Sequence, residues 1–137
     1  MKTINWLGWV AALVVGQVIG ILWYGILLSA AWMKAMGMTE ADFVGTEWRM
    51  GLGILNMAII LIGLDWLIRR LEARTWLGGA KVGLAACVFF DLTVVALDYV
   101  YAAGNLSLFW IDGGYQLLTY TLGGALLGGL KLKPRAG

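Results

Sequence analysis

The sequence predicts an all-α integral membrane protein, a four-helix bundle with both termini in the cytoplasm. Hydrophobic residues make up 61% of the chain, and the mean hydropathy is +0.84. Charged residues are only 13% of the chain, too few to cover the surface of a water-soluble domain. Four apolar runs, 4–30, 48–68, 78–103 and 108–130, are each long enough to cross a hydrocarbon core about 30 Å thick.

These runs form a single transmembrane domain, because the connections between them are short. In the connection between the first two runs, Gly37 is expected to end a helix. Thr39 is followed three residues later by Asp42, which predicts a capping box at the start of another helical turn. The single proline, Pro134, lies beyond the last run, so none of the predicted helices is kinked by proline.

The basic residues are distributed unequally between the two sides of the predicted membrane. Four crossings place both termini and the 69–81 connection on one side, which carries eight of the ten basic residues. The other side carries Lys34 and Arg49. Because Lys and Arg are enriched in cytoplasmic loops, both termini are predicted to be cytoplasmic. The expected location is the bacterial cytoplasmic (inner) membrane, with several passes.

The sequence also excludes several kinds of site. It has no histidine and a single cysteine, which excludes a histidine base, a histidine metal ligand and an internal disulfide. Cys87, which lies in an apolar run, is expected to pack as a small inert side chain. Phosphate loops, nucleotide fingerprints and nucleic-acid motifs are absent from the sequence. We therefore expect no cofactor, no metal site and no nucleic-acid partner.

Two aspartates lie inside the third apolar run, where a carboxylate that faces lipid costs about 2.5–3.5 kcal/mol. Asp91 and Asp98 are seven residues apart, so they share one face of a helix, which we expect to point into the bundle. Polar residues recur at helical spacing on the other three runs. The predicted polar seam, a candidate ion or proton site, comprises Asp91, Asp98, Asp112, Arg49, Asn56, Gln17, Gln116 and Thr119.

The depths of the seam residues suggest their partners. Arg49 and Asp98 both lie in the outer parts of their runs, so an ion pair between them is expected. Asp91 has no cation at its depth, so it is expected to be protonated or hydrogen-bonded to Asn56 or Gln17.

The seam has two interpretations, interhelical hydrogen bonding and a route for a proton or cation. Asp65 belongs to neither interpretation, because Arg69 lies four residues further along the same predicted helix. An ordinary ion pair is expected there, with no functional role.

Small residues recur at four-residue spacing on two of the runs. They allow close approach of helix backbones, as in the GxxxG pattern. We expect them to form a helix-packing face, used either within the bundle or between protomers of an oligomer: Ala12, Gly16, Gly20, Gly124 and Gly128.

The order of these landmarks resembles a family of small bacterial membrane proteins known as domain of unknown function 1761. The segments that carry the resemblance are INW at 4–6, WYGILLSAAWMKAMGMTEADF at 23–43, WLGGAKVG at 76–83 and FWIDGGYQLLTYTLGG at 109–124. The resemblance implies a four-helix integral membrane protein and supplies no activity, substrate or catalytic residue. A structural role is expected for the outer turn and the residues packed beneath it: Tyr24, Trp32, Gly37, Thr39, Asp42, Gly113, Gly114 and Tyr115.

Three classes of function remain. We favour a non-enzymatic accessory or scaffolding protein that lies in the lipid bilayer and packs against other membrane proteins or itself. The alternative is a small proton- or cation-coupled transporter or channel that uses Asp91 and Asp98. An enzyme acting on lipids is the third class, for which only Asp91, Asp98 and Asp112 could supply acid–base chemistry.

Overall fold

The computed structural model describes residues 3–102 and 104–131, and all of its regular elements are helical. The first helix, α1 (Trp6–Gly20), continues without interruption into a π-helical segment, Ile21–Leu27. The chain then turns into the short helix α2 (Ser29–Met36) and a single 3₁₀ turn, Glu40–Phe43. Residues 6–43 therefore form one long helix with a bent outer end.

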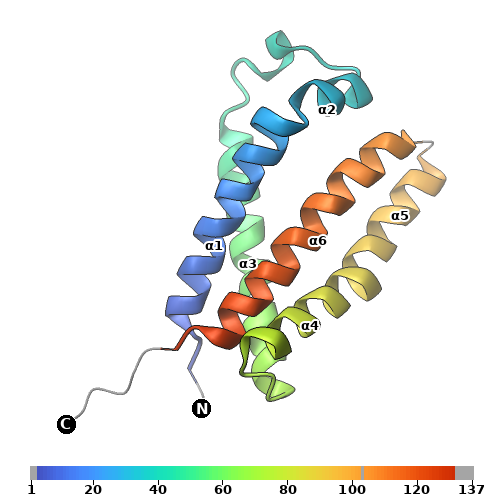
Figure 1. The fold of residues 1–137 in the computed structure, drawn as a ribbon. Coiled ribbons are helices and arrows are strands. Elements are labelled where there is room, and N and C mark those ends of the chain that lie inside the picture. The colour runs from blue at the N-terminus through green and yellow to red at the C-terminus, as the bar shows by residue number, and fades with distance from the viewer. Residues whose placement is uncertain (1–2, 103, 132–137) are drawn as a thin grey trace.

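The rest of the described chain contains three further long helical segments. Helix α3 (Trp48–Arg70) is followed by a continuous helix built from α4 (Trp76–Ala86), the π-helical segment Cys87–Asp91 and α5 (Leu92–Tyr101), and then by α6 (Leu106–Gly129). Figure 1 shows α6 between α1 and the α4–α5 helix, with α2 lying across the end of the molecule opposite the N-terminus.

Polar side chains fix where three of these helices begin. The side-chain oxygens of Asn5, Thr75 and Asn105 accept backbone N–H groups of the first turn of α1, α4 and α6, at 3.1, 2.9 and 2.9 Å. Such caps satisfy donors that have no partner within the helix.

The outer corner has the predicted structure. Gly37 follows α2 with a φ of 67°, the left-handed conformation that favours glycine, so the predicted helix end is confirmed. The predicted capping box is also confirmed, since the N–H and the hydroxyl of Thr39 donate to Oδ2 of Asp42 at 2.7 and 3.0 Å. These hydrogen bonds lower the pKa of Asp42. Trp32 stacks on Phe43 with ring centroids 5.4 Å apart, which ties α2 to the 3₁₀ turn.

Three helices of the described chain are long and apolar enough to cross a membrane: Trp6–Leu27, Trp48–Arg70 and Trp76–Tyr101. They correspond to the first three predicted runs. Helix α6 has 24 residues but is not among them, because its polar residues, including Asp112 and Gln116, lower its hydropathy. The chain is thus an all-helical, membrane-compatible protein with three candidate spans.

The closest helix contact joins α4 to α6 through four glycines. A methyl group on Gly79 would overlap the carbonyl oxygen of Gly124, and one on Gly124 would overlap the carbonyl oxygen of Gly79. Gly83 meets α6 in the same way, and a methyl group on Gly128 would overlap the backbone before α4. The two GxxxG patterns, Gly79 with Gly83 and Gly124 with Gly128, therefore pack against each other within one chain.

The described chain buries few large side chains. The core consists of Ala12, Leu61, Leu64, Ile68 and Leu127, from α1, α3 and α6. Many large apolar residues instead point outward along the helices, among them Ile26, Phe89, Phe90 and Val100, which are 66–71% exposed. In a membrane these side chains would contact acyl chains, so this distribution agrees with the predicted class.

Candidate functional site

The carboxylate of Asp112 is bound by tyrosines from two other helices. The hydroxyl of Tyr24 donates to Oδ1 at 2.6 Å, and that of Tyr99 donates to Oδ2 at 3.2 Å. At the adjacent residue of each segment, the indole N–H of Trp23 donates to the carbonyl of Ile111 at 2.8 Å. Asp112 on α6 is thereby joined to the first helix and to α5. Both of its oxygens accept a hydrogen bond, as expected of an acid that holds helices together.

Asp91 forms a second, simpler contact nearer the middle of its helix. The hydroxyl of Tyr120 donates to its Oδ1 at 3.4 Å, whereas Oδ2 is buried without a hydrogen-bond partner among the described residues. The expected bond to Asn56 or Gln17 is wrong. Gln17 donates instead to the sulfur of Met57 at 3.5 Å, and Asn56 is exposed.

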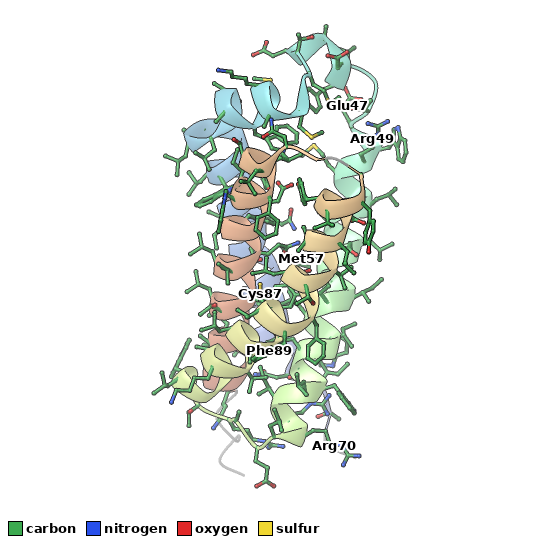
Figure 2. The ribbon with its side chains drawn as sticks, turned by 90° about the vertical axis from the view of Figure 1, so that its right-hand side faces the viewer. Glu47, Arg49, Met57, Arg70, Cys87 and Phe89 are labelled. Atoms are coloured by element: carbon green, nitrogen blue, oxygen red, sulfur yellow. The ribbon has the colours of Figure 1, made fainter. Side chains whose placement is uncertain are left out.

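The expected ion pair between Arg49 and Asp98 is also not formed. Both side chains are exposed, and the carboxylate of Asp98 has no hydrogen bond or ion pair with any described residue. The guanidinium of Arg49 lies over the ring of its neighbour Trp48, 5.6 Å from the centroid, and points away from the bundle (Figure 2). Asp98 lies one turn before the end of α5, so its exposure is tolerated close to the membrane surface.

The last two residues of the predicted seam, Gln116 and Thr119, both lie on α6. Thr119 is 8% exposed, and its hydroxyl donates to the carbonyls of Tyr115 and Gln116, at 3.0 and 3.2 Å. Gln116 is partly buried. The eight residues of the predicted seam are therefore divided among separate places and do not line one common axis. An ion or proton site at these residues stays a prediction.

The small residues of the first helix lie against other helices of the same chain. Ala12 is 2% exposed and belongs to the core. A methyl group on Gly16 would overlap the sulfur of Met57, and one on Gly20 would lie 3.4 Å from the hydroxyl of Tyr115. Together with Gly124 and Gly128, which face α4, these positions are occupied by packing within the chain.

The outer half of α3 has few neighbours. Every residue from 48 to 56 is exposed, and a methyl group on Gly51 or Gly53 would meet open space. Asn56 lies eight residues into the helix, about 12 Å from its outer end at ~1.5 Å per residue. Its side-chain amide has no hydrogen-bond partner among the described residues. If α3 spans a membrane, as its length and hydropathy allow, this polar group would face outward at the depth of the hydrocarbon core.

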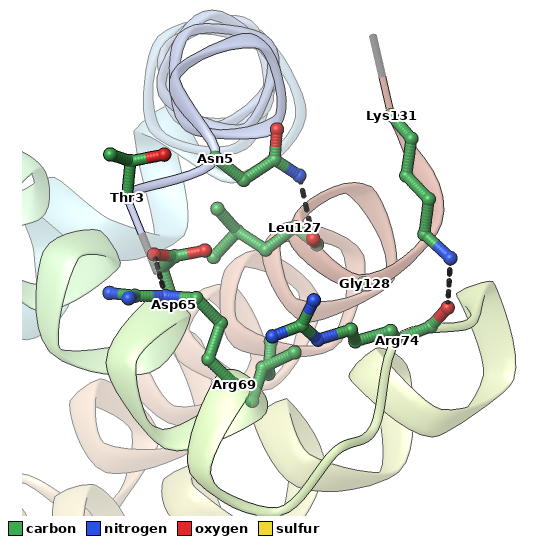
Figure 3. Close-up of a pocket in the computed structure, with 9 residues that line it drawn as sticks. Thr3, Asn5, Asp65, Arg69, Arg74, Leu127, Gly128 and Lys131 are labelled. Atoms are coloured by element: carbon green, nitrogen blue, oxygen red, sulfur yellow. Dashed lines mark hydrogen bonds and ion pairs between the residues drawn. The ribbon is translucent and has the colours of Figure 1, made fainter. Parts of the chain in front are cut away.

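A polar cavity that sequence reasoning missed lies at the opposite end of the molecule. It has a volume of about 350 Å³ and lies between the beginning of α1, the end of α3 and the end of α6 (Figure 3). Asn5 closes one side, since its amide donates to the carbonyls of Leu127 and Leu130 at 2.8 and 2.6 Å. The lining residues are Thr3, Asn5, Asp65, Ile68, Arg69, Arg74, Leu127, Gly128 and Lys131.

Charged groups with unfilled hydrogen-bonding capacity line this cavity. Asp65 is only 1% exposed, and its Oδ2 accepts from Nε of Arg69 at 2.8 Å, which confirms the predicted pair. Oδ1 of Asp65 and Nη2 of Arg74 are both buried without a partner among the described residues. The ammonium of Lys131 donates to the backbone carbonyl of Arg74 at 2.7 Å. The sequence feature that indicates this cavity is Asp65, an acid inside an apolar run, which is followed by the cations of Arg69 and Arg74.

A second cavity, about 320 Å³ in volume, lies between the end of α3 and α4. Apart from Lys81 its lining is apolar, so it offers little specific chemistry. Neither cavity is lined by Asp91, Asp98 or Asp112. Within the described part of the chain, no group of three or more Cys, Asp or Glu side chains could hold a metal ion.

Comparison with known proteins identifies the family. The model of the family described as "Protein of unknown function (DUF1761)" matches residues 7–128. The chain belongs to this family. The resemblance predicted from the sequence is thereby confirmed. The part matched by DUF1761 includes the tyrosine–carboxylate contacts and the glycine contact, whereas Asn5 and Lys131 of the inner cavity lie outside it. No curated protein and no solved structure matches the chain.

Two of the segments that carry the DUF1761 resemblance, 23–43 and 109–124, meet at the outer corner. Tyr24 contacts the rings of Trp32 and Tyr115 edge-on, with centroids 5.3 and 5.2 Å away. A methyl group on Gly114 would lie 2.8 Å from the indole of Trp23. The segment at 109–124 therefore packs beneath the segment at 23–43, in agreement with the structural role expected for these residues.

Proposed function

We propose that the chain is a non-enzymatic scaffolding protein of the bacterial cytoplasmic membrane that associates with a second copy of itself. It forms a four-helix bundle that spans the membrane four times, with both termini in the cytoplasm. The exposed outer half of α3 and the exposed face of α5 form the proposed contact surface. The observation that carries the proposal is the unpartnered amide of Asn56 inside the depth of the membrane.

Two features support four spans. Helix α6 has 24 residues, about 36 Å at ~1.5 Å per residue, which is enough to cross. It lies between α1 and the α4–α5 helix, so those apolar helices would shield its polar stripe from lipid (Figure 1). With four spans, eight of the ten basic residues would be cytoplasmic, as the positive-inside rule requires.

A second copy of the chain would supply hydrogen-bond partners for the side-chain amide of Asn56. An amide carries both donors and acceptors, so two Asn56 side chains related by a two-fold axis can hydrogen-bond to each other. Polar contacts between membrane helices contribute about 0.6–2 kcal/mol each. The open space at Gly51 and Gly53 would let a neighbouring helix approach closely.

The charges on this surface are complementary. Arg49 on α3 and Asp98 on α5 are both exposed at the outer end and have opposite signs. Under two-fold symmetry, Arg49 of one copy would face Asp98 of the other, and the same pair would form twice. Such exposed pairs are worth about 0–1 kcal/mol each, so they would orient the dimer more than hold it.

The test is the mass of the protein in detergent micelles and in nanodiscs, measured over a range of protein concentration. We expect a dimer, and we expect Asn56→Leu to shift it towards monomer by roughly tenfold in dissociation constant. Val18→Leu is the control, because Val18 is 50% exposed on α1, away from the proposed surface. A protein that stays monomeric throughout, or a dimer unaffected by Asn56→Leu, would overturn the proposal.

A proton- or cation-coupled transporter is the second candidate function. The observation in its favour is Oδ2 of Asp91, which is buried without a partner among the described residues near the middle of its helix. An unsatisfied carboxyl at this depth is typical of proton relays. Proton and sodium flux into liposomes should then fall to background in Asp91→Asn and remain in the control Glu40→Gln, at an exposed residue of the outer 3₁₀ turn. Equal flux in Asp91→Asn and the unmodified protein would exclude this candidate.

A further inference from the structure

The cavity at the inner end of the bundle has the size and position of a ligand site. Its volume of about 350 Å³ falls in the range of roughly 300–1,000 Å³ that is usual for small-molecule sites. Asp65 and Arg69, which line it, lie in the last turns of α3, where a spanning helix reaches the headgroups of the bilayer. The cavity therefore lies where the polar end of a phospholipid would reach it.

The charges of this cavity favour an anion. Three cations line it, from Arg69, Arg74 and Lys131, against the single acid Asp65. The guanidinium of Arg74 carries the unfilled donor, Nη2, and a planar guanidinium matches the oxygens of a phosphate group. Figure 3 shows the side chain of Arg69 turned towards Asp65, while that of Arg74 extends from the opposite side, beside Lys131.

Asp65 adds a second requirement for the ligand of this cavity. Its Oδ1 is an acceptor without a donor, in a side chain that is 1% exposed. A buried charged group without its hydrogen bond is unfavourable, and a purely anionic ligand would leave Oδ1 unfilled. The group that completes this site must therefore carry a donor close to its phosphate.

We propose that the cavity binds the headgroup of a phospholipid that combines a phosphodiester with an N–H or O–H donor, as ethanolamine and glycerol headgroups do. The phosphodiester contacts Arg74 and Lys131, and the donor reaches Oδ1 of Asp65. Basic pockets between spanning helices are known sites for lipid headgroups. This inference does not depend on self-association or on transport.

Retention of lipids by the full chain, measured by native mass spectrometry from mixed micelles, tests the proposal. The probes are phosphatidylethanolamine, phosphatidylglycerol and phosphatidylcholine at equal concentration. Phosphatidylcholine has the same phosphodiester but no N–H or O–H donor on its headgroup. We expect the first two lipids to be retained about tenfold better than phosphatidylcholine, the contribution of one charge-assisted hydrogen bond.

Arg74→Gln should reduce the retention of both preferred lipids by about tenfold. Arg70→Gln is the matched control, because it removes the same charge from a residue that lies over Trp66 and does not line the cavity. If Arg74→Gln does not fold, as judged by circular dichroism, Lys131→Gln takes its place with the same expectation.

Three results would overturn the proposal. Retention of phosphatidylcholine equal to that of the other two lipids would show that Asp65 does not bind a headgroup donor. Equal losses of lipid retention in Arg74→Gln and Arg70→Gln would show that the lipids are attracted to a basic surface and are not bound at a specific site. Displacement of the lipids by soluble phosphoethanolamine at equal concentration would assign the cavity to a free phosphate ester instead of a membrane lipid.

Discussion

The hydroxyl of Tyr24 donates a 2.6 Å hydrogen bond to Oδ1 of Asp112, and this contact joins two helices that are 88 residues apart in the sequence. Tyr99 binds the other oxygen of the same carboxylate from α5. Asp112 thus holds three helices together at their outer ends. An acid in a spanning helix can in this way serve the stability of the bundle.

Removing the Tyr24 hydroxyl should destabilise the bundle. We expect Tyr24→Phe to lower the free energy of unfolding by about 1–2 kcal/mol, because Oδ1 of Asp112 loses its donor. Tyr101→Phe serves as the control, since Tyr101 is 85% exposed. The measurement is unfolding in mixed micelles with increasing dodecyl sulfate. Equal stability of the two variants would show that the Tyr24 contact contributes nothing.

The glycine contact between α4 and α6 should tolerate no side chain. Gly83→Ala would place its methyl group on the carbonyl oxygen of Tyr120, so the helices must separate. We expect a loss of about 1–3 kcal/mol or more, as in overpacked cores. Gly63→Ala on α3 meets open space and should be neutral or stabilising by up to ~1 kcal/mol. Thermal unfolding in detergent would measure both, and equal melting temperatures would contradict the close contact.

The capping box at the outer corner should depend on acid pH. The hydrogen bonds from Thr39 lower the pKa of Asp42 below its usual value of about 3.9. Its stabilising effect is therefore present above about pH 4 and is lost as the pH falls through the lowered pKa. Protection of the amides of residues 39–43 from exchange, relative to the intrinsic rate at each pH, should fall in that range, and Asp42→Asn should remove this fall. Protection that does not change with pH in the unmodified chain would contradict the capping box.

Cys87 should be unreactive while the protein is folded. Its side chain is 0% exposed, and a thiol inside an apolar helix contact is protonated and out of reach of reagents. A water-soluble maleimide should label the unmodified protein only after denaturation. Ser107→Cys, at an exposed position in the first turn of α6, should be labelled at once and serves as the control. Rapid labelling of Cys87 in the folded protein would show that α4 and α6 open.

The helical class could be predicted because it depends on composition and length. The predicted run 48–68 became α3, and Gly37 and Asp42 behave as local turn chemistry requires. These features need only neighbours in sequence. Helix α6 lies outside the three candidate spans because hydropathy counts its polar residues equally, whether they face lipid or another helix.

The partners of the polar residues could not be predicted in the same way. Gln17 and Tyr24 are seven residues apart and share a face in an ideal helix, but Tyr24 lies within a π-helical segment with a wider turn. Gln17 therefore meets Met57 on α3, while Tyr24 meets Asp112 on α6. Tyrosine is largely apolar and does not stand out in an apolar run, but tyrosine hydroxyls supply the donors to Asp91 and Asp112.

Depth along the helices was also not enough to predict an ion pair between Arg49 and Asp98. Arg49 and Asp98 lie at similar depths, but a helical wheel does not encode the lateral separation of two helices. The burial of Asp65 likewise depends on α1 and α6, which are distant in sequence, so the cavity beside it was visible only in the fold.

The central claim, association of two copies through α3 and α5, is tested most directly by reversing its two charges. Arg49→Asp or Asp98→Arg alone places like charges opposite each other at two symmetric positions, and should weaken the dimer by roughly tenfold. The double variant restores both pairs with their signs exchanged, and its dimerisation constant in nanodiscs should return to that of the unmodified protein. A double variant as weak as either single variant, or single variants that dimerise normally, would contradict the account.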